Sequence, residues 1–153
     1  MNRDGRLVLV VAATVSFAVA LLHIAIILVG PAGYRYFGAP GLADQIERGS
    51  VVQPTLLTLG IALVFALWGA YALSGAALIR RLPLVRTALL VIGVIFVARG
   101  LLIAPEVAAL IQGALKYPRS LVFSGVSLST GLCYLFGAAR AWGSLHPWRS
   151  HGG

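Results

Sequence analysis

The chain has 153 residues, of which 59% are hydrophobic and only 10% are charged, and its mean hydropathy is +0.94. Soluble domains carry about 25% charged residues, so this composition excludes an ordinary soluble domain. The net charge is +8 at pH 7, but the basic residues stand singly or in pairs rather than in one patch. Because no nucleic-acid-binding motif accompanies them, we expect a membrane protein with no nucleic-acid partner.

Four long apolar runs account for most of the chain: Leu7–Gly30, Val52–Ile79, Leu82–Ala104 and Leu121–Trp142. Each has about 20 residues or more, enough for a helix that rises 1.5 Å per residue to cross a hydrocarbon core of roughly 30 Å. The sequence therefore predicts an all-α membrane protein, a four-transmembrane-helix bundle. Residues 1–145 are predicted to form its single transmembrane domain, followed by a flexible tail at 146–153.

The first run resembles a secretory signal peptide at its start. Arg3 and Arg6 form a basic beginning, and Ala18–Ala20 resembles a cleavage site. The apolar run continues beyond that point to Val29, however, with only His23 intervening. This continuation favours an uncleaved first span over a signal peptide that is removed.

The connections on the outer side are longer than the inner turn. Within the loop Pro31–Ser50, the segment Ala43–Glu47 is suited to one or two helical turns. In Pro105–Tyr117, apolar residues recur at helical spacing, which predicts a short helix on the outer surface. The alternative is an extension of the third span that breaks near Pro105. The inner turn around Arg80–Pro83 is very short, which predicts antiparallel neighbours.

Orientation follows from the arginine and lysine residues outside the spans. Seven lie on one side: Arg3, Arg6, Arg80, Arg81, Arg86, Arg140 and Arg149. Four lie on the other: Arg35, Arg48, Lys116 and Arg119. Because positively charged loops stay in the cytoplasm, both termini are predicted to be cytoplasmic, in a bacterial-type inner (plasma) membrane.

Rows of small residues indicate where the spans pack, since membrane helices associate through close contact of such residues. The row in the first span is Ala12, Ser16, Ala20, His23 and Gly30, and the row in the second is Thr55, Thr58, Ala62, Ala66, Gly69 and Ala76. The row in the fourth span is Ser120, Ser124, Ser127, Gly131, Tyr134 and Ala138. The fourth span has a second row, Gly125, Ser129, Cys133 and Gly137. It suits either tight internal packing, which we favour, or contact with another subunit. The third span is apolar almost all round and is expected to face lipid most broadly.

Polar side chains in the outer layer of the spans define a candidate site. Arg99 lies close enough to the outer end of its span for its side chain to extend to the headgroups without a partner. Alternatively, it joins the polar residues that the other spans place at similar depth. That second interpretation predicts an outward-facing ligand-binding pocket, formed by Arg99, His23, Glu106, Thr58 and Ser124.

The same residues argue against catalysis and metal binding. His23 has no carboxylate within the spans to orient it, and a lone histidine in an apolar helix usually bonds to a hydroxyl or carbonyl across the interface. A metal would need more ligands than the spans supply, and His146 and His151 lie in the tail. Cys133 has no second cysteine. We therefore predict no catalytic residue, no metal and no cofactor.

Three classes of function stay open. The interpretation we favour is a small membrane module that binds a lipid, another amphiphile or a protein partner through the outward-facing pocket. An oligomeric transporter of small solutes or lipids is the alternative, although no span has the mid-depth carboxylate that proton-coupled export needs. A membrane-embedded enzyme is the third. The expected partners are membrane lipids, with a second copy of the chain or another membrane protein as further candidates.

Overall fold

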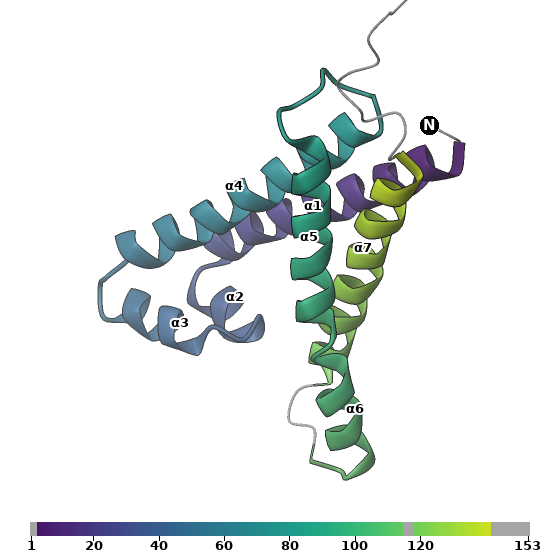
Figure 1. Ribbon diagram of the computed structural model, residues 1–153. Coiled ribbons are helices and arrows are strands. Elements are labelled where there is room, and N and C mark those ends of the chain that lie inside the picture. Colours follow the sequence, from purple (N-terminus) through teal and green to yellow (C-terminus); the bar gives the residue numbers. More distant parts are fainter. Residues whose placement is uncertain (1–2, 115–117, 142–153) are drawn as a thin grey trace, which may run out of the picture. The chain divides into compact units, whose positions relative to one another are not determined.

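The computed structural model describes residues 3–114 and 118–141, and these are helical apart from short connections. The helices are α1 (Arg3–Val29), α2 (Pro31–Tyr36), α3 (Pro40–Glu47), α4 (Val52–Gly75), α5 (Val85–Gly100), α6 (Ile103–Ile111) and α7 (Arg119–Ala141) (Figure 1). The chain divides into two compact units. The first unit is Met1–Ala13 with Ala70–Gly153, and the second is Thr14–Gly69. Each is described by itself below.

The predicted fold class is confirmed, because the described residues contain four helices long and apolar enough to cross a membrane. They are Arg3–Val29, Val52–Gly75, Val85–Ile111 and Arg119–Arg140. The second and third spans are separated by more chain than predicted, since two residues there adopt left-handed backbone conformations. Ala77 has φ 56° just after α4, and Leu84 has φ 53° just before α5. The predicted tail, 146–153, lies outside the described residues.

Ser74 organises the turn between α4 and α5. Its side chain is buried, its Oγ accepts a hydrogen bond from the Leu82 N–H at 2.9 Å, and its hydroxyl lies 3.3 Å from the Arg80 carbonyl, to which it donates. One hydroxyl thus satisfies two backbone groups that no helix pairs. The turn brings the end of α4 against α5, where a Cβ built on Gly75 would lie 2.8 Å from Leu89 Cδ1.

Helices α5 and α7 lie side by side and antiparallel (Figure 1). A Cβ built on Gly93 would lie 2.7 Å from Leu135 Cδ2, and one built on Gly100 would lie 2.5 Å from Leu128 Cα. An advance of seven residues along α5 therefore matches a step of seven residues back along α7. Only glycine permits backbones this close, so these positions fix the register of the pair.

The predicted small-residue rows are buried in part. Their buried members are Ala12, Ser16, Ala20, Thr58, Ala62, Gly69, Ala76, Ser124, Gly131, Tyr134 and Ala138. Their half-buried members are His23, Gly30, Thr55, Ala66, Ser120 and Ser127. In the second row of α7, a Cβ on Gly137 would lie 2.5 Å from Leu9 Cγ of α1, while Ser129 is exposed. Part of this second row therefore packs internally.

The structure differs from the sequence-based expectations at α5, at the loop after α1 and at α6. The third span was expected to face lipid most broadly, but Leu89, Ile92 and Phe96 bury one face of α5, and 28% of this span is buried against 22% of the second. The loop after α1 forms two helices, and the sequence indicated only the second, α3.

Helix α6 follows α5 after only Leu101 and Leu102, which keep right-handed helical dihedral angles. This arrangement fits the alternative of an extended third span, although the interruption precedes Pro105. Pro105 is the third residue of α6 and is tolerated there, because the first turn of a helix lacks intrahelical partners for its N–H groups. Residues 115–117 of the predicted surface helix lie outside the described residues.

We expect Gly100→Ala to destabilise the α5–α7 pair, because the new Cβ would lie 2.5 Å from both Cα and the backbone nitrogen of Leu128. A backbone cannot rotate away as a side chain can, and over-packing of this kind costs about 1–3 kcal/mol. Gly125→Ala is the matched control, since its nearest neighbour, Ile103 Cδ1, would lie 3.8 Å away. Thermal unfolding in mild detergent measures both variants. Equal midpoints for the two would contradict the packing described here.

Candidate functional site

The structure joins two of the predicted site residues, Arg99 of α5 and Ser124 of α7. Arg99 Nη1 donates a hydrogen bond to Ser124 Oγ at 3.2 Å. Ser124 is fully buried, whereas Arg99 is exposed. The serine hydroxyl therefore anchors a guanidinium that other molecules can still approach.

The Arg99 side chain runs along the helix pair rather than across it. Because Gly100 lies against Leu128, Arg99 is level with Ser129 in the antiparallel register. Ser124 comes five residues before Ser129 in α7, which is about 7.5 Å towards the end where α5 gives way to α6. This is the extended conformation expected of an arginine whose charge extends out of the apolar layer. Its guanidinium nevertheless bonds to Ser124 of the neighbouring helix, so Arg99 has a side-chain partner there.

Glu106 lies in the first turn of α6, where a carboxylate interacts favourably with the helix dipole. Its Oε2 atom is buried and has no hydrogen-bond partner within the part of the chain that the structure describes. In the same part of the chain, no ion pair joins Glu106 to Arg99. Buried polar atoms normally have a hydrogen-bond partner. The Glu106 carboxylate can therefore accept a hydrogen bond from a donor outside the described residues.

His23 and Thr58 belong to the second unit, and Arg99, Ser124 and Glu106 to the first. Thr58 is buried on α4. His23 Nδ1 lies 2.7 Å from the Val19 carbonyl, to which the protonated nitrogen donates, and the ring stacks on Phe65 with centroids 5.4 Å apart. The carbonyl belongs to the histidine's own helix, not to a neighbour as the sequence suggested. The pocket of all five residues stays a prediction.

Among residues 3–114 and 118–141, no three His, Cys, Asp or Glu side chains lie close enough to hold a metal ion. The tail histidines considered above are outside these residues. Cys133 is a free, half-buried thiol.

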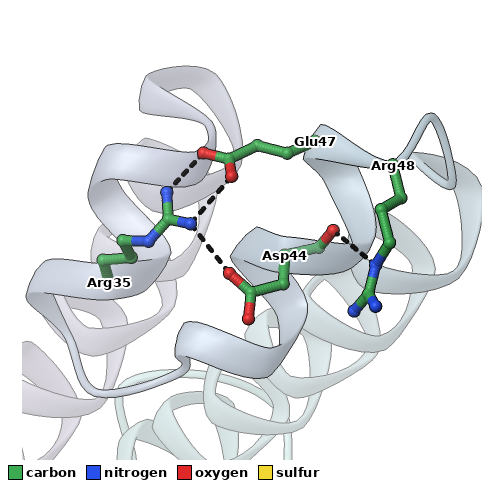
Figure 2. Close-up of polar contacts among 4 residues, drawn as sticks. All are labelled: Arg35, Asp44, Glu47 and Arg48. Carbon is green, nitrogen blue, oxygen red and sulfur yellow. Dashed lines mark hydrogen bonds and ion pairs between the residues drawn. The ribbon is translucent and has the colours of Figure 1, made fainter.

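Sequence reasoning missed an ionic cluster that links α2 to α3, and we call it the arginine clamp: Arg35, Asp44 and Glu47 (Figure 2). Arg35 Nη2 donates to Asp44 Oδ1 at 2.7 Å and to Glu47 Oε2 at 2.8 Å, and Arg35 Nη1 also bonds to Glu47 Oε1. Arg48 Nε donates to the Asp44 carbonyl at 3.1 Å. The spacing of the two acids is three residues, which places them on one face of a helix. This spacing, opposite a lone arginine, was the signal available.

The second unit also contains an apolar cluster. Ile26, Tyr34 and Ala43 form its buried centre. The Tyr34 hydroxyl lies 3.3 Å from the Pro54 carbonyl, to which it donates, so α2 is attached to the beginning of α4. Beside this cluster, α1 and α2 line an open apolar groove of about 220 Å³, with Val29 and Tyr36 among its walls. The hairpin is thus held by apolar packing inside and by charges outside.

Comparison with known proteins gives no assignment: no family model, no curated protein and no solved structure matches this chain. Function must therefore be inferred from the chemistry of the residues themselves.

Acid is expected to loosen the α2–α3 hairpin. Hydrogen bonds from Arg35 hold the pKa of Glu47 below its usual value, and the same bonds raise the pKa of Arg35. A carboxyl whose pKa is lowered by folding stabilises the folded state above its unfolded pKa, about 4.3. That contribution disappears as the pH falls through the lower, folded pKa. Hydrogen exchange of the α2 and α3 amides, corrected for intrinsic rates, should therefore accelerate between pH 5 and pH 3, on the order of these pKa values.

Glu47→Gln should show faster exchange already at pH 7 and much less change with pH. Arg48→Gln serves as the control, because its contact is with a backbone carbonyl and leaves the arginine clamp intact. Identical pH profiles for Glu47→Gln and the unmodified protein would contradict a stabilising role for this ion pair.

Proposed function

We propose that this small multi-pass membrane protein binds the headgroup of a zwitterionic phospholipid at the Arg99–Ser124–Glu106 site. The observation that carries the proposal is the hydrogen bond from Arg99 to the buried Ser124, which holds an exposed guanidinium in a fixed place. The role is that of a binding module rather than an enzyme.

Arg99 is suited to the phosphate of such a headgroup. A guanidinium carries five N–H donors in a planar fork, and Ser124 accepts from one nitrogen. The remaining donors suit two phosphate oxygens, a geometry for which arginine is better fitted than lysine. Because Ser124 already orients the side chain, less conformational entropy is lost when the phosphate binds.

Glu106 is suited to the amine. Its buried Oε2 has no donor among the described residues, and a primary ammonium supplies a charge-assisted one. Phosphatidylethanolamine carries both groups in one headgroup. Phosphatidylcholine has the same net charge, but its quaternary ammonium has no N–H. The proposal therefore predicts a preference between two lipids that differ mainly in that donor.

We also propose that both termini are cytoplasmic, in a bacterial-type inner membrane. Support comes from the arginine excess at the end where α1 begins and α7 ends. On this topology the Arg99 site faces outward.

Native mass spectrometry from mild detergent, with each lipid added in turn, tests the binding proposal. The unmodified protein should retain phosphatidylethanolamine over phosphatidylcholine by roughly tenfold, because a charge-assisted hydrogen bond contributes about 1.5–3 kcal/mol. Glu106→Gln should reduce that preference, and Arg99→Gln should weaken the binding of both lipids by roughly tenfold.

Arg48→Gln is the matched control, since it removes one exposed arginine from a different site. Thermal midpoints of all variants separate lost binding from lost folding. Equal retention of the two lipids by the unmodified protein would refute the proposal, and so would equal losses in Arg99→Gln and Arg48→Gln.

A further inference from the structure

A group of arginines lies at the end of the first unit where α5 begins and α7 ends, away from the Arg99 site. We call it the arginine collar: Arg3, Arg6, Arg80, Arg81, Arg86 and Arg140. Among the described residues at this end, 3–6, 80–86 and 140, the one carboxylate is Asp4. The collar is therefore strongly cationic, and none of its members belongs to the Arg99 site.

Packing around Leu9 shows that these arginines share one end. A Cβ built on Gly137 of α7 would lie 2.5 Å from Leu9 Cγ, and one built on Gly75 of α4 would lie 3.2 Å from Leu9 Cδ1. The same Gly75 position is 2.8 Å from Leu89 of α5. Four helices thus meet at the level of Leu9.

Each helix leads from this level to the same side, because α1 and α5 begin there and α4 and α7 end there. Arg6, Arg86 and Arg140 each lie three residues beyond a residue of that level, which corresponds to about 4.5 Å along a helix axis. In the α5–α7 register, Arg140 is level with Ala88, two residues from Arg86. Arg80 and Arg81 follow in the turn that leaves α4.

Two parts of the collar are held in place by specific contacts. Ser74 bonds the Arg80 carbonyl and the Leu82 N–H, which fixes the backbone that carries Arg80 and Arg81. The Arg140 guanidinium carbon lies 4.7 Å from the centroid of the Phe136 ring, which orients that side chain on α7. Arg80 and Arg140 are both exposed. A ligand that binds here therefore meets a fixed backbone at Arg80 and an oriented guanidinium at Arg140.

We propose that the arginine collar is a binding site for a phospholipid that carries two phosphate groups. Basic clusters at the cytoplasmic ends of membrane helices are suited to such headgroups, and each basic residue near the surface strengthens the attraction. The Arg80–Arg81 turn supplies one cationic position and the Arg86–Arg140 pair of helix ends supplies a second. A lipid whose two phosphates are covalently joined engages the second position at a high effective concentration, which a lipid with one phosphate cannot do.

This proposal is independent of the Arg99 site. There, one arginine stands near one carboxylate-bearing helix and suits a headgroup with no net charge. Here, six arginines accompany one carboxylate and suit a polyanion. On the proposed topology, the collar faces the cytoplasmic leaflet, where the anionic lipid surface lies.

The test uses the full chain in mild detergent and compares tetraoleoyl cardiolipin with dioleoyl phosphatidylglycerol at twice the concentration, so that the phosphate concentrations are equal. Native mass spectrometry counts bound lipid, and the thermal midpoint follows binding. Cardiolipin should bind roughly tenfold or more tightly than phosphatidylglycerol. Arg80→Gln combined with Arg140→Gln should reduce cardiolipin binding on the order of 30-fold, given the contribution of each basic residue.

Two comparisons keep the result interpretable. Arg48→Gln with Arg119→Gln removes the same charge from segments outside the collar and should leave cardiolipin binding within a factor of about two. Arg80→Lys with Arg140→Lys retains the charge and should recover most of the binding. Phosphatidylethanolamine retention at Arg99 should be unchanged in the collar variant, which also shows that the variant is folded.

Three results would overturn the proposal. The first is equal binding of the two lipids at equal phosphate concentration. The second is an equal loss in the collar variant and its charge-matched control, which would indicate general charge attraction. The third is displacement of cardiolipin by millimolar inorganic phosphate, on the order of its free concentration in cells, which would indicate a site for the free anion.

Discussion

Close backbone contact between α5 and α7 sets the positions of the polar groups at both ends of the first unit. Gly93, Gly100 and Gly131 allow the two helices to approach until side chains of one touch the backbone of the other. In lipid, apolar side chains have no reason to prefer one another, so such contacts supply the specificity that burial supplies in water. Once the register is fixed, Arg99 can reach Ser124 towards one end, and Arg140 comes level with the start of α5 at the other.

The arrangement of the spans was largely readable from the sequence, because the physical rule is simple. A run of about 20 apolar residues has few alternatives to a helix when water is absent. Small-residue rows also predicted the buried faces, since Ser16, Thr58 and Ser124 are buried as expected. The rule fails for α5: bulky residues such as Leu89 and Phe96 pack as readily as they face lipid, so composition alone could not locate its buried face.

The candidate site was predictable only in part, and for a related reason. Arg99 and Ser124 were both expected in the outer layer of the spans, but their backbones differ in level by about 7.5 Å, and the length of the arginine side chain closes that difference. Glu106 could not be placed in the same way, because α5 ends at Gly100 and α6 begins only at Ile103, so a residue count along one helix does not carry across the interruption. His23 was expected to bond across an interface, but the Val19 carbonyl four residues earlier was closer. The arginine clamp was missed because its arginine and its acids lie on different short helices, 9 and 12 residues apart.

Charge is distributed very differently at the two ends of the first unit, and this difference constrains function more than any single residue does. If the collar arginines served only to orient the spans, an excess of Lys and Arg on the cytoplasmic side would be enough.

Orientation alone does not require the hydrogen bond from Ser74 to the Arg80 carbonyl, nor the contact of Arg140 with the Phe136 ring. Fixing a cation in one place costs conformational entropy, which a solvated charge would retain. Such order is favourable overall when a ligand with charges at a matching separation binds, because the entropy is then lost before binding rather than during it. The same reasoning applies to Arg99, which Ser124 orients while its guanidinium stays exposed. The proposed headgroup sites therefore place their arginines on positions that other side chains already constrain, at both ends of the first unit.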